Sequence, residues 1–536
     1  MPKNDANFAI GTPAARMIRS FLTVSSGTLA SRLLGFLRDS MIAALLGTGP
    51  VADAFLVAFQ LVNVIRRLLT EGALNAALVP VWLRLRETEG EAAASRFAGR
   101  ALGTISAVLV AGSVLLGLLM PFVIAALAPG FSGSETLRDA VDDARLMLPF
   151  LAFAGPTTVL LALSSAQGRF FLTAFSPLLF NAALIAVMLA LIIAGSEARV
   201  VALALAATVG AAGFLQLLVL VMRRAGEKAA SPLRVAFDGE MRGFLGHAVP
   251  GMVASSGPQL LAVAGAMIAS ASPSAVSWLY FANRLIELPL GIVGVAMGTV
   301  LVPELTRAVR GGEKGTIAQA ESRALELAVG LALPATFGLM ALSEPIVRLL
   351  FEHGAFTAAD TVATSRSLNW LALGLPAHVL VKAVSPAFFA REDTLAPLSA
   401  ALKGFVFAII SAVLLGHFYG ASGIAAGIAL GAWSNVLSLI RRGGETFGFS
   451  LDAAARQRLP RIALSALVMG ALLWLAAHVT GLFAADAHRL AQAVILMAAI
   501  AGGIAVYGLC LTSFGMTGWR ETVKAIRQGK PRDLRS

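Results

Sequence analysis

Long apolar blocks, separated by short polar and charged segments, form the main pattern along this chain. Blocks such as residues 98–127 and 491–514 contain hardly any charged residue. A block of roughly 20 apolar residues has the length that a helix needs to cross about 30 Å of hydrocarbon. The ten-residue alternation of an outer-membrane barrel does not occur. The pattern therefore predicts an all-α polytopic membrane protein.

About 14 transmembrane helices are predicted. They cover residues 21–46, 52–83, 98–127, 146–167, 177–194, 200–222, 244–270, 275–306, 317–342, 362–390, 398–416, 424–440, 462–482 and 491–514. An even number places both termini on one side of the membrane. Of the 42 lysines and arginines, 29 lie in or beside the segments on the side of the termini, and six lie on the other side. This asymmetry predicts cytoplasmic termini.

An internal duplication with a separation of roughly 220 residues divides the predicted spans into two lobes. Val79-Pro80 recurs as Val302-Pro303, and the turn at 169–177 recurs at 390–397. Six-helix repeats of the same orientation are typical of transporters, with the substrate path between them. We expect a tail at 1–20, a first lobe at 21–222, a linker at 223–243, a second lobe at 244–440, a linker at 441–461, two further helices at 462–514 and a tail at 515–536.

Composition adds limits to this prediction. The net charge of +12 follows mainly from the cytoplasmic loops, so it indicates contact with anionic phospholipids and not nucleic-acid binding. Cys510 is the only cysteine, which excludes a disulfide framework and a thiolate metal site. The chain has no phosphate-binding GxxxxGK[ST] loop, so we expect no hydrolysis of nucleotide by this chain.

Arg32, Arg38 and Arg66 lie well inside predicted spans and have no carboxylate three or four residues away. An arginine in mid-membrane costs about 3 kcal/mol or more, so it usually faces a cavity or a partner. These three must find a partner on another helix or in a bound anion. The rigid guanidinium fork fits a phosphate in a two-pronged manner, which makes a pyrophosphate a suitable ligand.

Other charges in the spans have a local explanation. Arg67 and Glu71 are four residues apart, and Arg284 and Glu287 are three apart, so each pair can meet on its own helix. For Arg284 a substrate contact remains an alternative to this local pair. Two lysines near span ends, Lys382 and Lys403, are expected to extend toward the membrane surface.

Several segments resemble the MurJ (MviN) lipid II flippase family. They are SRLLGFLRDS (31–40), ADAFLVAF (52–59), NVIRRLLTEGALNAALVPV (63–81), SWLYFANRLIELPLGIVGVAMGTVLVPEL (277–305), FEHGAFTAAD (351–360) and FFAREDTLAP (388–397). The resemblance extends over both lobes. It implies the fold of the multidrug/oligosaccharidyl-lipid/polysaccharide (MOP) exporters, with two six-helix lobes around a central cavity and two helices beside a groove for a lipid tail.

The implied activity is the movement of lipid II, the undecaprenyl-pyrophosphate-linked disaccharide-pentapeptide, from the cytoplasmic to the periplasmic leaflet of the bacterial inner membrane. The resemblance makes Arg32, Arg38, Arg66 and Arg284 the expected substrate-binding residues. The residues expected to support or gate the cavity are Ser31, Asp39, Asp53, Asn63, Arg67, Glu71 and Glu287.

No cofactor and no metal are expected. Some relatives bind sodium, but the spans at 398–416 and 424–440 contain no acidic residue, so that site is not expected here. Coupling to the membrane potential or to an ion gradient is a hypothesis. The expected partners are lipid II and membrane phospholipids, and other cell-wall synthesis proteins are candidate partners.

Alternative functions remain open at this point. A flippase for another polyprenyl-pyrophosphate sugar would need similar arginines, whereas a drug antiporter would need carboxylates in the membrane. A membrane enzyme acting on the same lipid would need paired carboxylates, a metal cluster or a histidine base, and the six histidines have no ligand spacing. A scaffold of cell-wall synthesis would not explain arginines kept in the membrane.

Overall fold

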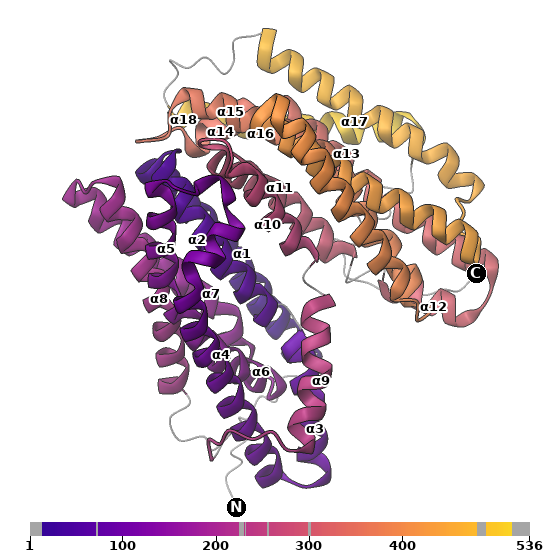
Figure 1. Cartoon of the computed structure of the whole chain (residues 1–536). Helices are drawn as coiled ribbons and strands as arrows, with labels where there is room; N and C mark the ends of the chain where they lie inside the picture. The colour runs from indigo at the N-terminus through magenta and orange to yellow at the C-terminus, as the bar shows by residue number, and fades with distance from the viewer. Residues whose placement is uncertain are drawn as a thin grey trace, which may run out of the picture. The chain divides into compact units, whose positions relative to one another are not determined.

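The computed structural model describes residues 13–70, 73–223, 230, 232–254, 257–297, 302–479 and 489–516, and their regular structure is helical (Figure 1). The chain forms two compact units, Met1–Val263 and Ala264–Ser536. The first contains α1 (Pro13–Leu46), α2 (Pro50–Thr70), α3 (Ala73–Thr88), α4 (Glu91–Leu127), the 3-10 turn η1 (Pro129–Phe131), α5 (Glu135–Met147), α6 (Pro149–Ala166), α7 (Phe170–Ala194), α8 (Ala198–Arg223) and α9 (Gly239–Ala254). Helix α10 (Gly257–Ala269) spans the division.

The second unit contains α11 (Ala275–Ala296), α12 (Val302–Gly311), α13 (Lys314–Ala341), α14 (Ser343–Phe351), α15 (Ala358–Phe389), α16 (Leu395–Phe447), α17 (Ala453–Val479) and α18 (Arg489–Ser513). The sequence did not predict α5, which occupies most of an expected connection. Its acidic stretch lowers the hydropathy there, although the segment still forms a helix.

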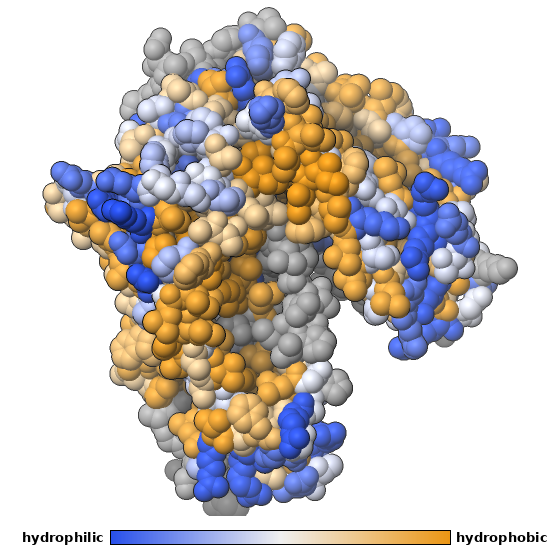
Figure 2. Space-filling view, in the orientation of Figure 1, coloured by the Kyte–Doolittle hydropathy of each residue, from blue (hydrophilic) through white to orange (hydrophobic). Residues whose placement is uncertain are grey.

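Nine helical segments within the described ranges are long and apolar enough to cross a membrane. They include ten of the predicted spans, since α16 holds two, and so confirm the polytopic class. Leu118 and Phe122 of α4 and Ile193 of α7 leave more than two thirds of their surface exposed, as lipid-facing side chains do. Figure 2 shows extended patches of hydrophobic side chains on one face of the surface. The full number of 14 spans stays a prediction.

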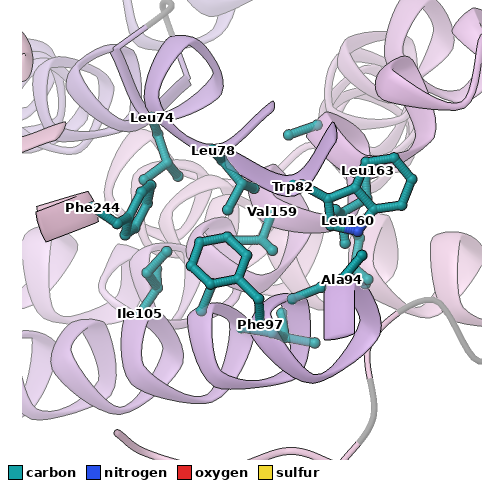
Figure 3. Close-up of a cluster of buried hydrophobic side chains, with 14 of the residues drawn as sticks. Leu74, Leu78, Trp82, Ala94, Phe97, Ile105, Val159, Leu160, Leu163 and Phe244 are labelled. Carbon is teal, nitrogen blue, oxygen red and sulfur yellow. The ribbon is translucent and has the colours of Figure 1, made fainter. Parts of the chain in front are cut away.

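A core cluster in the first unit joins α3, α4, α6 and α9 (Figure 3). Leu74, Leu78 and Trp82 follow one another at intervals of four residues, so they lie on one face of α3. Across from them Phe97 of α4 is fully buried, and its ring meets Phe244 of α9 edge to face at 6.1 Å. Helix α9 therefore packs within the first unit, and the lobe boundaries given above remain predictions.

The segment before α9 is also attached to the first unit. Arg100 of α4 forms ion pairs with Asp238 and Glu240. Asp238 Oδ1 accepts a hydrogen bond from the Met241 amide at 3.0 Å, which caps the start of α9. This amide and the nearby Arg100 lower the pKa of Asp238 below its usual value.

Helix α16 is a hairpin of two antiparallel helical segments that turns at Gly420, whose backbone is not helical (φ 56°, ψ −137°). The turn falls between the two predicted spans at 398–416 and 424–440. Glycines allow the two segments to touch backbone to backbone. A Cβ on Gly427 would lie 2.3 Å from the Ala412 nitrogen, and one on Gly431 would lie 2.3 Å from Ala408 Cβ.

We expect Gly427→Ala to lower the free energy of unfolding by about 1–3 kcal/mol, because overpacking forces the two segments of the hairpin apart. Gly444→Ala in the same helix is the matched control, since a Cβ there meets no atom within 4 Å. The measurement is the unfolding midpoint of each purified full-length variant. Equal midpoints would show that the hairpin does not depend on this contact.

The connection before α15 is ordered by side chains of the FEHGAFTAAD segment. Thr357 and Asp360 form a capping box at the start of α15. Asp360 Oδ1 also accepts a hydrogen bond from Trp278 Nε1 of α11 at 3.1 Å, and Phe356 is buried against Phe281. These contacts fix α11 relative to α15, and α11 carries Arg284.

Candidate substrate-binding site

Arg38 is buried in the first unit and already has partners for its guanidinium. Its side chain pairs with Asp39 at 2.6 Å, and Nη1 donates to Asn181 Oδ1 of α7 at 2.9 Å. The guanidinium carbon lies 5.1 Å from the ring centre of Phe59 and 5.9 Å from that of Phe180. Only 7% of Arg38 and none of Asp39 is exposed. This arrangement holds α1 against α2 and α7.

Sequence reasoning missed both partners of Arg38. Adjacent residues do not normally face each other on a helix, so the spacing rule passed over Asp39. Asn181 is uncharged, and the apolar residues of α7 around it gave it no obvious role. The sequence signal that could have revealed Asn181 is that it is a single amide within an apolar run, because a buried amide in a membrane helix needs a partner. Its Nδ2 also donates to the Ser31 carbonyl at 3.2 Å.

Arg32 differs from Arg38 although both belong to α1. It is half-buried, and within the described part of the chain no hydrogen bond or ion pair reaches it. Because Asn181 binds the Ser31 carbonyl, the backbone is fixed one residue before Arg32. Arg32 therefore stays a candidate for contact with an anion.

Helix α2 carries Arg66 and Arg67, both half-buried. Arg66 Nε donates to Asn63 Oδ1 at 3.3 Å, one turn earlier on the same helix. Glu71, the expected partner of Arg67, lies outside the described residues. Asp53 is 2% exposed in the first turn of α2, where the helix dipole favours a negative charge.

The predicted pair of Arg284 and Glu287 is confirmed in the second unit. Arg284 Nη1 lies 2.7 Å from Glu287 Oε2, and their side chains are 22% and 30% exposed. Lys382 of α15 is near them in the fold, since its Nζ donates to the Leu290 carbonyl of α11 at 3.5 Å. A Cβ on Gly294 would approach this Nζ to 3.0 Å, so the glycine makes room for the lysine.

The four expected substrate-binding arginines thus divide between the units, with Arg32, Arg38 and Arg66 in the first and Arg284 in the second. Among the residues that the structure describes, no group of three or more histidine, cysteine, aspartate or glutamate side chains gathers as metal ligands do. In each unit, a cation held in an apolar helix suits an anionic ligand.

Comparison with known proteins decides the family. The family model described as "Lipid II flippase MurJ" matches residues 42–490. The chain belongs to the MurJ lipid II flippase family. MurJ membership identifies it as a transporter and not an enzyme. The matched range includes Arg66 and Arg284, whereas Arg32 and Arg38 precede it.

Curated MurJ relatives cover nearly the whole chain. A protein of Rhizobium meliloti (strain 1021) named "Probable lipid II flippase MurJ" is 37% identical over 507 residues, which are 94% of this chain and 94% of that protein. A protein of the same name from Rhizobium tropici is 34% identical over 500 residues, 92% of this chain and 93% of the relative.

Solved structures confirm the MurJ and MOP fold. "Lipid II flippase MurJ, inward closed conformation" matches with a TM-score of 0.76 at 22% identity, over 94% of this chain and 100% of that chain. An inward-facing multidrug resistance transporter of the MATE family, in the MOP superfamily, matches with a TM-score of 0.63 at 15% identity. The match covers 80% of this chain and 95% of that chain. At these identities the likeness concerns the fold alone.

Proposed function

We propose that this protein moves lipid II from the cytoplasmic to the periplasmic leaflet of the inner membrane. The family match over residues 42–490 is the observation that carries the proposal, and relatives that cover more than nine tenths of the chain are named for the same substrate. The cationic side chains on α1, α2 and α11 agree with a substrate that contains a pyrophosphate.

Different arginines have different tasks in this proposal. Arg32, Arg66 and Arg284 bind the pyrophosphate, because each is half-buried in an apolar helix. Arg38 acts as a positioning residue, since all three of its guanidinium nitrogens already donate to Asp39 or Asn181. Glu287 holds the Arg284 side chain in place until the substrate arrives.

In this proposal, transport proceeds by alternating access. The arginines capture the pyrophosphate from the cytoplasmic side, the prenyl tail stays in lipid, and the two units then rearrange to open toward the periplasm. Both termini face the cytoplasm, as the distribution of lysine and arginine favours. Because the cargo is anionic, the membrane potential can contribute about 2.3 kcal/mol per charge for each 100 mV.

Depletion of the protein in cells tests the function. We expect the amount of lipid II accessible from outside to fall after depletion and to recover with the wild-type chain. Arg32→Ala, Arg66→Ala and Arg284→Ala should fail to restore it. Arg199→Ala is the matched control, because Arg199 pairs with Asp139 and is 60% exposed at the start of α8.

Two results would contradict the proposal. Full recovery with all three arginine variants would remove the pyrophosphate-binding role. An unchanged external pool of lipid II after depletion would point to another polyprenyl-pyrophosphate cargo or to a scaffold. Measurement of the other prenyl-linked sugars in the same cells separates these two cases.

A further inference from the structure

The second unit contains an open cavity of about 500 Å³ that the proposed transport does not use. This volume lies in the usual range of small-molecule sites, about 300–1,000 Å³. One face of α15 forms its main wall, with Arg366, Asn369, Trp370 and Leu373 at helical spacings of three and four residues. The end of α13 and the turn of the α16 hairpin complete it.

Two polar side chains of this wall have no partner within the described part of the chain. Arg366 is exposed, and no hydrogen bond or ion pair reaches it. Asn369 lies one turn further along, and its Oδ1 is buried without a hydrogen bond. Burial of an amide oxygen without a partner costs about 1–3 kcal/mol, so a ligand that supplies a donor is favoured here. The lining residues that the structure describes include a cation and no carboxylate.

The remaining lining indicates a lipid. Trp370 is 47% exposed and Tyr419, next to the turn at Gly420, is 70% exposed. Exposed tryptophan and tyrosine are typical of the level at which lipid headgroups lie. Met340 of α13 and Leu373 give the cavity an apolar part beside the polar one.

The length of α15 also indicates that the cavity lies at the level of the lipid headgroups. This helix has 32 residues, so it is about 48 Å long and extends beyond about 30 Å of hydrocarbon. Arg366 lies eight residues after the start at Ala358, or about 12 Å along the helix. A helix of this length centred on the hydrocarbon layer extends about 9 Å beyond it at each end, which puts Arg366 about 3 Å inside the boundary with the headgroups.

We propose that this cavity binds the headgroup of an anionic phospholipid. Arg366 pairs with the phosphate, Asn369 Oδ1 accepts a hydrogen bond from a hydroxyl group of the headgroup, and the upper acyl chain lies against Leu373 and Met340. A choline headgroup fits less well, because its quaternary ammonium has no N–H to donate to Asn369 Oδ1 and meets no carboxylate among the described lining residues. The proposal is independent of the transported cargo and of the direction of transport.

Quenching of Trp370 fluorescence tests this site in full-length protein reconstituted in lipid nanodiscs. Brominated phosphatidylglycerol and brominated phosphatidylcholine are the two quenchers, and the Trp370→Phe variant is subtracted to remove the other five of the six tryptophans. We expect half-maximal quenching at a roughly tenfold lower fraction of phosphatidylglycerol, as loss of a charged hydrogen bond would change affinity. Arg366→Gln should abolish this preference.

Controls distinguish a specific site from a general charge effect. Arg366→Lys keeps the charge and should retain part of the preference, and Arg199→Gln, which removes an arginine paired with Asp139, should retain all of it. Equal quenching by both lipids, or a preference that persists in Arg366→Gln, would overturn the proposal. Displacement of the brominated lipid by stoichiometric undecaprenyl phosphate would overturn it too, by assigning the cavity to the polyprenyl lipid.

Discussion

Replacement of Arg38 by alanine is expected to lower the free energy of unfolding by about 3 kcal/mol, a larger effect than replacement of Arg32, Arg66 or Arg284. The reason is the buried Asp39 carboxylate, which is 0% exposed and would lose the guanidinium at 2.6 Å. Asn181 would lose the same partner, so α7 would be held less firmly against α1. The measurement is chemical unfolding of the purified full-length protein.

A double variant tests the cause of this loss. Arg38→Ala combined with Asp39→Ala removes both charges, and we expect it to be more stable than Arg38→Ala alone. Arg32→Ala is the matched control on the same helix and should unfold like the wild type. If Arg38→Ala also unfolds like the wild type, the buried network does not hold α1, and Arg38 returns to the candidates for substrate contact.

The sequence was sufficient for the fold class because the hydrocarbon thickness imposes a length on each helix. The interruption between residues 416 and 424 correctly marked the turn at Gly420, since the apolar run stops there. Helix ends were less predictable. Helix α4 begins at Glu91, seven residues before the apolar block, because a helix can continue into water where hydropathy no longer marks it.

Contacts at the candidate site could be predicted only where they were local. The pair of Arg284 and Glu287 follows from helical spacing, and the structure contains it. The contact between Arg38 and Asn181 joins residues 143 positions apart, and no periodicity in one helix can reveal it. The different surroundings of Arg32 and Arg38 could therefore be recognised only from the packing of α1 against α7.

Because Arg32 has no described partner, its replacement is expected to have a large effect on substrate binding and not on stability. Arg32→Ala should weaken binding of an undecaprenyl-pyrophosphate lipid by roughly ten- to a hundredfold, because a hydrogen bond to a charged group contributes about 1.5–3 kcal/mol. Its unfolding should stay unchanged, since no described residue pairs with Arg32. Titration of the lipid into purified protein measures the affinity. Arg32→Lys should recover part of it, as a point charge lacks the two-pronged geometry. Unaltered affinity in Arg32→Ala would leave α1 as a support for the site and move the pyrophosphate contact to Arg66 and Arg284.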